Sequence, residues 1–432
     1  MSQRMPTHDG PPRSPSLLAA LCLIAALNGL DEDRIDGQCV LQCAPLSGNQ
    51  ATVWITSLPL ILGGNDAMDR RSFLTRAGVT ASVAATFPAP AIAQSIRELK
   101  IVTSWPKGLP GPGTSAERLG RGITEVTDGR LKVQVFGAGQ LVSAFEVFDA
   151  VSNGVADMYH SAEYYWEKRS PAFNFFAAVP FGFTADEIAA WIHFGGGQAL
   201  WDELSAGFNI KPLMSTNTGV QMGGWFTKEV KGAESYAGLV YRMPGLGGEV
   251  LRRLGAVVVN LPGGEITAAL KSGAIDASEW VGPWNDMILG LHKVSKFYYY
   301  PGFHEPGTIL SLGINKKLWD GLTADDRNAI STVANAEYTL SLAEFNANNA
   351  KALQQLREDK TIEIRKFDDS LLQALGRASG EVVADTGQND PLTRRIYDSY
   401  ISFWNRSIRW TDVAERSYLD ARGLKFPYGD KV

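Results

Sequence analysis

Cysteine is almost absent from this sequence and is confined to one end of it. Of 432 residues, only Cys22, Cys39 and Cys43 carry a thiol. The chain after residue 43 therefore cannot use a cysteine nucleophile, a thiolate zinc site or an iron–sulfur cluster. A long stretch without thiols also suits an oxidising compartment, where stray thiols pair wrongly.

Several catalytic patterns are missing as well. The chain has no Gly-x-x-x-x-Gly-Lys-Ser/Thr phosphate loop, no His-Glu-x-x-His zinc motif, no Gly-x-Ser-x-Gly turn and no complete dinucleotide fingerprint. Lys and Arg total 41 against 46 Asp and Glu, so the basic excess that nucleic acids require is also lacking. We expect no nucleic-acid partner and no ATP hydrolysis, and we expect the protein not to be an enzyme.

An export signal is predicted at residues 68–93. The run Met-Asp-Arg-Arg-Ser-Phe-Leu at 68–74, a short apolar stretch and Ala-Ile-Ala at 91–93 resemble a twin-arginine (Tat) signal with its cleavage site. Because such signals begin a chain, we interpret residues 1–67 as a mis-assigned upstream extension; an additional leader is the alternative. The mature protein is then expected in the periplasm.

From residue 96 onwards, β-branched segments alternate with helical patterns, which predicts an α/β fold. Strands are expected at 99–104, 131–136 and 156–160, with helices at 114–127 and 144–153. After Gly219 the alternation of strand and helix patterns begins again. Strands are expected at 222–227, 239–243 and 256–260, and helices at 247–254 and 264–272. The restart predicts a second lobe of similar design.

One long helix is predicted from Thr323 to about Glu358. Thr323 and Asp326 form an acidic capping box, and apolar residues recur on one face. These residues are Ile330, Ala334, Tyr338, Leu342, Phe345, Leu353 and Leu356. A helix of this length either braces two lobes or reaches a partner subunit, and the second alternative predicts a homodimer. A homodimer is the assembly that we expect. A second helix, at 395–410, either docks on a neighbouring chain or packs within its own.

Arg242 stands at the end of an apolar strand, before a Pro-Gly turn and a helix. An arginine that enters a buried surface needs an anion, and its planar fork fits a carboxylate held by two parallel hydrogen bonds. That anion is either an acid of the chain or a bound ligand. The segments that follow favour the ligand.

Four segments together resemble the extracytoplasmic solute receptors of TRAP (tripartite ATP-independent periplasmic) transporters. They are residues 137–141, 150–157, 241–250 and 261–280. The resemblance implies a two-lobed periplasmic binding protein fold with a hinge and a long lobe-spanning helix. The lobes would be 96–217 plus 305–345, and 218–304 plus 346–432. It also implies a small carboxylic acid as ligand, Arg242 as the partner of its carboxylate, and membrane permease subunits as partners.

Within that family, the chain looks most like the branch that binds 2-oxo acids or lactate-like hydroxy acids through a bound cation. The resemblance implies that Na⁺ or Ca²⁺ is held by the Gln221 side-chain oxygen, the Glu279 carboxylate and the Trp280 carbonyl oxygen, with Glu305 as a further site residue. All these ligands are oxygens, which suits hard cations. Ca²⁺ would leave excess positive charge unless Glu305 also binds it, and the choice between the ions stays open.

The expected ligand contacts are Arg242, Gln221, Tyr165, Trp280, Trp105 and Phe181, and Tyr164, Trp225 and Trp284 are further candidates for the cleft wall. We expect Arg242 to have no acidic partner until the ligand arrives. His160, His193, His292 and His304 show no metal-ligand spacing and are interpreted as structural or exposed. Two alternatives remain, a Tat-exported periplasmic enzyme and a ligand-sensing receptor for a signalling kinase.

Overall fold

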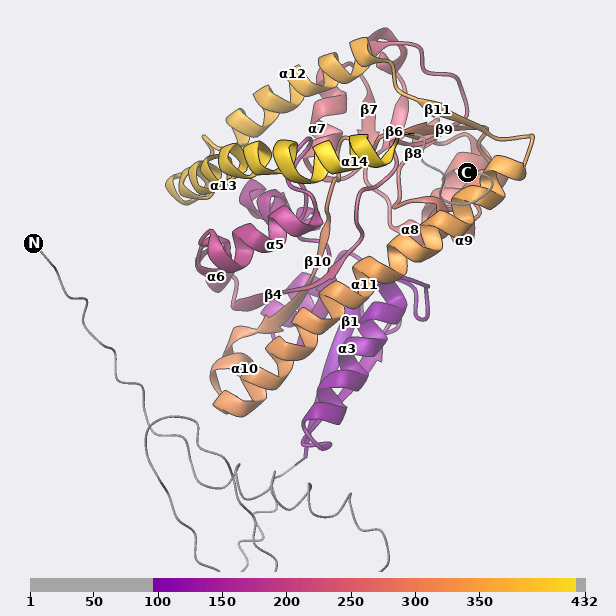
Figure 1. Cartoon of the computed structure of the whole chain (residues 1–432). Coiled ribbons are helices and arrows are strands. Elements are labelled where there is room, and N and C mark those ends of the chain that lie inside the picture. The colour runs from indigo at the N-terminus through magenta and orange to yellow at the C-terminus, as the bar shows by residue number, and fades with distance from the viewer. Residues whose placement is uncertain (1–95, 425–432) are drawn as a thin grey trace, which may run out of the picture. The chain divides into compact units, whose positions relative to one another are not determined.

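A computed structural model describes residues 96–424 (Figure 1). The predicted export signal at 68–93 and the extension at 1–67 lie outside the described residues. The described part contains a five-stranded and a six-stranded sheet with helices around them, so the predicted α/β class is confirmed. No helix within residues 96–424 is long and apolar enough to cross a membrane.

The first sheet has the strand order β2-β1-β3-β10-β4. Its strands are β1 (Arg97–Thr103), β2 (Leu131–Phe136), β3 (Met158–Ser161), β4 (Ile210–Asn217) and β10 (Ile309–Asn315). β1 runs parallel to β2 and β3, whereas β10 is antiparallel to both β3 and β4. The strands predicted at 99–104, 131–136 and 156–160 are confirmed, and β4 and β10 were not predicted.

The second sheet repeats this order, as β7-β6-β8-β5-β9, and adds β11 at its edge. Its strands are β5 (Gly224–Phe226), β6 (Val240–Arg242), β7 (Val257–Val259), β8 (Ala277–Ser278), β9 (Phe297–Tyr300) and β11 (Glu363–Lys366). β5 is antiparallel to β8 and β9, as β10 is to its neighbours in the first sheet. The predicted second lobe of similar design is therefore confirmed.

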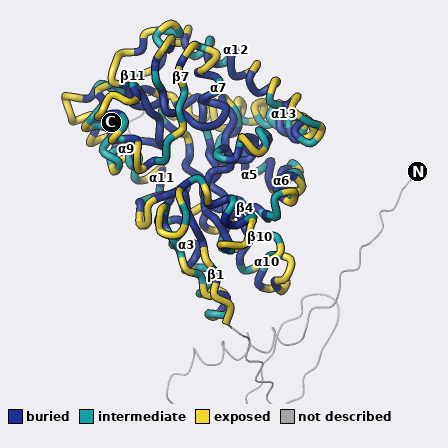
Figure 2. The backbone as a smooth tube through the Cα atoms, turned by 180° about the vertical axis from the view of Figure 1, so that it is seen from behind, coloured by how far each residue is buried: buried dark blue, intermediate teal, exposed yellow. Residues whose placement is uncertain are grey.

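Helices cover the sheets, and most exposed residues lie on these helices and on loops (Figure 2). They are α3 (Pro112–Val126), α4 (Val147–Ser152), α5 (Ala185–Phe194), α6 (Gly197–Ala206), α7 (Gly245–Arg253), α8 (Gly263–Ser272), α9 (Pro283–Leu289), α10 (Lys316–Asp320), α11 (Ala324–Glu358), α12 (Asp369–Thr386), α13 (Pro391–Thr411) and α14 (Ser417–Arg422). α4 is shorter than the helix predicted at 144–153, because residues 143–146 form a turn closed by the bond from Glu146 N to Ser143 O.

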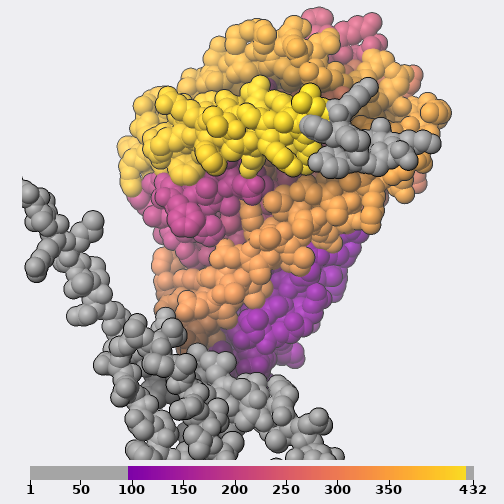
Figure 3. All heavy atoms as spheres, in the orientation of Figure 1, coloured from indigo at the N-terminus to yellow at the C-terminus, as the bar shows by residue number. Residues whose placement is uncertain are grey.

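The long helix α11 is confirmed, with 35 residues. The Thr323 side chain accepts a hydrogen bond from Asp326 N at 3.1 Å, which caps the first turn. α11 contacts β4 and α3 of the first lobe and α9 of the second (Figures 1 and 3). It therefore spans both lobes, as the first of the two predicted alternatives required.

Helix α13 packs within the chain. It contacts α5, α6 and the short helix at Pro171–Phe176, all of which lie between strands of the first sheet, although the sequence assigned this region to the second lobe. Ile396 and Tyr400 are buried, whereas Trp410 near the end of the helix is 70% exposed. The lobe boundaries themselves stay a prediction.

The chain crosses between the sheets three times, at 218–223, at 301–308 and along α11, which leads from β10 to β11. The first two crossings are hydrogen-bonded to each other: Gln221 N donates to Glu305 O at 3.2 Å, and Gly302 N donates to Gln221 O at 2.9 Å. A Cβ at Gly302 would lie 2.4 Å from Gln221 O, so only glycine permits this approach. The contact fixes Gln221 and Glu305 side by side between the lobes.

Candidate functional site

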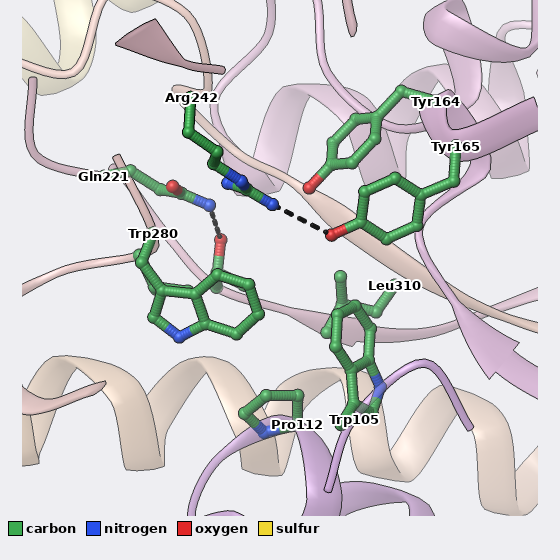
Figure 4. Close-up of a pocket in the computed structure, with 10 residues that line it drawn as sticks. Trp105, Pro112, Tyr164, Tyr165, Gln221, Arg242, Trp280 and Leu310 are labelled. Atoms are coloured by element: carbon green, nitrogen blue, oxygen red, sulfur yellow. Dashed lines mark hydrogen bonds between the residues drawn. The ribbon is translucent and has the colours of Figure 1, made fainter. Parts of the chain in front are cut away.

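The site lies beyond the carboxyl ends of four parallel strands, two from each sheet. Trp105 follows β1, Tyr165 follows β3, Arg242 ends β6 and Trp280 follows β8. In open α/β sheets, ligands bind in the crevice at these strand ends. These four residues line one pocket (Figure 4). It is lined by Trp105, Pro112, Tyr164, Tyr165, Thr218, Gln221, Arg242, Trp280, Val281 and Leu310.

The pocket is narrow. The space open to the centre of a water molecule is about 10 Å³, which is about the room that one water needs. Aromatic rings form much of the wall: Trp105 meets Trp280 edge-on at a centroid distance of 6.1 Å and Tyr165 at 6.3 Å. Residues of both lobes thus meet across the pocket, and a larger occupant requires the lobes to part.

Arg242 is 1% exposed and is held on three sides. Its Nε donates to Leu261 O at 3.0 Å, Nη1 forms an ion pair with the Glu279 carboxylate, and Nη2 lies 3.4 Å from the Tyr165 hydroxyl. Burial alone would lower the pKa of Arg242, but the neighbouring Glu279 raises it above its usual value. Figure 4 shows the hydroxyls of Tyr164 and Tyr165 pointing toward the guanidinium.

The expectation that Arg242 lacks an acidic partner is wrong. In the parallel pairing of β6 with β8, Arg242 lies opposite Ser278, which places the next residue, Glu279, beside the guanidinium. The pair is buried on both sides. It occupies Nη1 and leaves Nη2 directed at Tyr165 in the pocket, so one end of the guanidinium fork is fixed and the other faces the cavity.

A buried cluster of Glu279, His304 and Glu305 adjoins this pair. One ligand atom of each residue lies within 4.8 Å of the others. Burial raises the pKa of Glu279 to about 7 although Arg242 opposes the shift, and burial together with Glu279 raises the pKa of Glu305 to about 7. Burial lowers the pKa of His304 to about 4. Two buried acids share the one charge of Arg242 here, which is electrostatically unfavourable unless a further cation binds.

Gln221 supplies an oxygen without a partner. Its Nε2 donates to Glu305 Oε2 at 2.8 Å and to Thr218 Oγ1 at 3.1 Å, while Oε1 is buried and has no hydrogen-bond partner among the described residues. An unsatisfied buried polar atom costs about 1–3 kcal/mol. A hard cation would satisfy this oxygen together with the nearby carboxylates, so the donor set fits the predicted ion.

The pocket wall is tied to helix α11 by a chain of hydrogen bonds. Trp105 Nε1 donates to His160 Nδ1 at 2.8 Å, so His160 Nε2 carries the proton and donates to Thr216 Oγ1 at 3.0 Å. Thr216 bonds Ser115, whose hydroxyl donates to Glu337 on α11 at 2.7 Å. Every donor in this chain points the same way, which fixes the indole of Trp105 relative to the helix that spans both lobes.

Three aromatics proposed for the ligand contacts or the cleft wall lie elsewhere. Phe181 is 38% exposed and packs against Phe303 instead of lining the pocket. Trp225 Nε1 donates to Asp286 at 3.0 Å, and Trp284 packs against Phe345. Their sequence neighbourhood gave no signal for which way each ring would point.

Asp286 is a positioning residue that the sequence analysis missed. Its Oδ1 accepts from the backbone N–H groups of Val281 and Gly282, both at 3.1 Å, and its Oδ2 accepts from Trp225 and from Tyr298. These four bonds hold the loop that carries Trp280. The place of Asp286 in the first turn of α9 was the only sequence signal for this role.

Comparison with known proteins identifies the family. A family model for bacterial extracellular solute-binding proteins, family 7 (DctP), matches residues 104–389. The chain belongs to this family. The predicted resemblance to TRAP solute receptors is therefore confirmed, as is the expectation of a substrate-binding receptor and not an enzyme.

This solute-binding protein has close relatives. A monocarboxylate 2-oxoacid-binding periplasmic protein of Nostoc sp. PCC 7120 is 39% identical to it over 319 residues. The match covers 74% of this chain and 87% of the relative. A TRAP solute-binding protein of Pseudoalteromonas atlantica, solved with sodium and pyruvate, is 34% identical, with a TM-score of 0.74 over 77% of this chain and 100% of that one. A TRAP solute-binding protein of Bordetella bronchiseptica, solved as a mixed-occupancy dimer with calcium and picolinate, is 33% identical to this chain. Its TM-score is 0.74, and the match covers 76% of this chain and 97% of that one.

Proposed function

We propose that this solute-binding protein captures a small 2-oxo acid such as pyruvate, together with Na⁺ or Ca²⁺, and delivers it to a TRAP permease. The observation that carries this proposal is the juxtaposition of Arg242, which faces the pocket through Nη2, with the unpartnered oxygen of Gln221. The pocket thus offers hydrogen-bond donors for a carboxylate and, at Gln221, an oxygen for a cation. The relatives that bind 2-oxo acids support the same ligand class.

In this proposal the acid is held by charges of both signs. Its carboxylate accepts from Nη2 of Arg242 and from the Tyr165 hydroxyl, which lie 3.4 Å apart. Gln221 Oε1, the Glu279 carboxylate and the Trp280 carbonyl oxygen hold the cation, with Glu305 nearby. Arg242, Glu279, Na⁺ and the ligand carboxylate then sum to zero charge, and Glu279 serves both the arginine and the cation.

The narrow aromatic walls favour small acids. Trp105, Tyr164 and Trp280 leave little room beside Arg242, so we expect pyruvate to bind more tightly than branched 2-oxo acids and much more tightly than dicarboxylates. A second carboxylate would be buried without a partner, which costs several kcal/mol. Lactate, whose hydroxyl oxygen replaces the keto oxygen, is the second candidate. Calorimetric titration of the four ligand types in Ca²⁺ buffer checks this order, and tightest binding of a dicarboxylate would contradict it.

Transport requires the lobes to open and close. We propose that the lobes 96–217 plus 305–345 and 218–304 plus 346–432 rotate about the crossings that carry Gln221 and Glu305. A ligand that contacts both lobes stabilises the closed form, which the permease recognises. A Tat signal at 68–93 would direct the protein to the periplasm, the compartment in which its relative from Nostoc is named.

We also propose that two chains of the protein form a homodimer. Trp410, Val413 and Tyr418 are exposed by 64–72% at the end of α13 and beyond, and they give a second chain an apolar surface. Light scattering on the mature protein is expected to give twice the chain mass. Trp410→Ser should shift the population toward monomer, whereas the exposed Phe194→Ser on α5 should not. A monomer at all concentrations in the unsubstituted protein would contradict the dimer.

A further inference from the structure

Asn285 links the two lobes outside the ligand pocket. It lies in the first turn of α9 in the second lobe, and its Nδ2 donates to Pro110 O at 3.1 Å in the loop from β1 to α3 of the first lobe. The side chain is buried and does not line the pocket. The bond therefore joins the lobes directly, as the bond between Arg242 and Tyr165 does inside the pocket.

The loop that contains Pro110 belongs to one wall of the pocket. Trp105, which lines the pocket, lies at the start of this loop. At Gly111 a Cβ would lie 2.8 Å from Phe345 Cζ of α11 and 3.0 Å from Asn285 Nδ2, and the φ of +85° also favours glycine there. The loop is therefore built to approach α9 and α11 closely, and the bond from Asn285 fixes it there.

The next residue, Asp286, holds the opposite wall. Its carboxylate accepts from two backbone N–H groups of the loop that carries Trp280. One turn of α9 is thus bonded to both walls, through Asp286 to the wall of its own lobe and through Asn285 to the wall of the other lobe. Between these two bonds, Trp105 meets Trp280 edge-on at a centroid distance of 6.1 Å.

The bond to Pro110 is the one hydrogen bond that the Asn285 side chain forms within residues 96–424. Its Oδ1 is buried and has no partner there. Asn285 therefore makes no side-chain hydrogen bond inside its own lobe, and replacing it removes a contact between the lobes alone.

We propose that Asn285 is a positioning residue that stabilises the closed form of the binding site and so sets the rate at which the acid leaves. The bond to Pro110 O forms when the wall of Trp105 meets the second lobe, and it breaks when the lobes part. A contact made in one form and not in the other shifts the equilibrium toward the form that has it. The inference rests on the proposed function, because it requires the lobes to close on the acid, and it adds a residue that does not touch the acid.

The experiment measures the tryptophan fluorescence of Asn285→Ala in stopped flow, with pyruvate in Ca²⁺ buffer. We expect the dissociation rate constant to rise about three- to tenfold, the effect of one hydrogen bond, and the association rate constant to stay within about twofold. The melting temperature of the ligand-free protein should not change, although loss of a merely structural contact would lower it. An unchanged dissociation rate constant would overturn the inference.

Asn315→Ala is the matched control. Asn315 Nδ2 also donates to a backbone carbonyl oxygen, Val151 O at 2.7 Å, but within the first lobe. Asn315 lies at the end of β10 that pairs with the start of β3, whereas the pocket lies beyond the end of β3. Asn315→Ala should lower the melting temperature of the ligand-free protein and leave both rate constants for pyruvate unchanged.

Crystals of the ligand-free, unsubstituted protein provide a test that needs neither the variant nor a ligand. Asn285 Nδ2 and Pro110 O should then lie more than about 3.5 Å apart, beyond the reach of a hydrogen bond. An intact bond without ligand would overturn the inference. Failure of the unsubstituted protein to bind pyruvate would instead refute the proposed function, and this distance would still test the role of Asn285.

Discussion

Arg242→Gln is expected to weaken pyruvate binding by about 2–5 kcal/mol, because a buried ligand carboxylate loses its charged partner. This corresponds to a rise in Kd of roughly 30- to 4,000-fold. The pyruvate Kd of Arg242→Lys should lie between those of the unsubstituted protein and of Arg242→Gln. Lysine keeps the positive charge but loses the planar fork that contacts Leu261, Glu279 and Tyr165 at once. Isothermal calorimetry in Ca²⁺ buffer measures all three proteins.

The matched control for this variant is Arg130→Gln. Arg130 also pairs with a buried acid, Asp326, but at the start of α11, away from the pocket. It should lower stability without changing the pyruvate Kd. An unchanged Kd in Arg242→Gln, in protein shown by circular dichroism to be folded, would refute the assignment of Arg242 to the ligand.

Glu279→Gln is the second large expected effect. Removing this carboxylate leaves Arg242 buried without its acid, and breaking one side of a buried ion pair typically costs about 3–5 kcal/mol of stability. The cation loses a charged ligand in the same step. We therefore expect a lower denaturation midpoint and, separately, loss of any difference in pyruvate affinity between Ca²⁺ and choline buffers.

Glu344→Gln provides the comparison, since Glu344 pairs with Arg118 between α11 and α3 and does not line the pocket. It should keep the full dependence of pyruvate affinity on the cation. If Glu279→Gln also kept that dependence, Glu279 would not be a ligand of the cation.

The sequence predicted the first three strands of each lobe along the chain and missed β4, β8, β9, β10 and β11. β2 was predicted with its observed bounds, because its apolar and polar residues alternate. β4 was missed because Pro212 argues against a strand; the structure places β4 at a sheet edge, where proline is tolerated. β8 was missed because it has two residues, too few for a periodic signal, whereas β5 lies within the strand predicted at 222–227.

The sequence predicted which residues form the site, but it did not predict which of them form an ion pair. The family resemblance selected Trp105, Tyr165, Gln221, Arg242 and Trp280, and the structure brings all five to one pocket. The ion pair of Arg242 with Glu279 depends on the register of two strands more than thirty residues apart in the chain. A linear pattern does not contain that register.

The central claim is that one cation and one arginine hold the acid together. The most direct measurement is calorimetric titration of chelated, unsubstituted protein with pyruvate in choline buffer, repeated with Na⁺ and with Ca²⁺. We expect the pyruvate affinity to rise at least about tenfold, or 1.4 kcal/mol, when one of these ions is restored. Equal pyruvate affinity in all three buffers would contradict it.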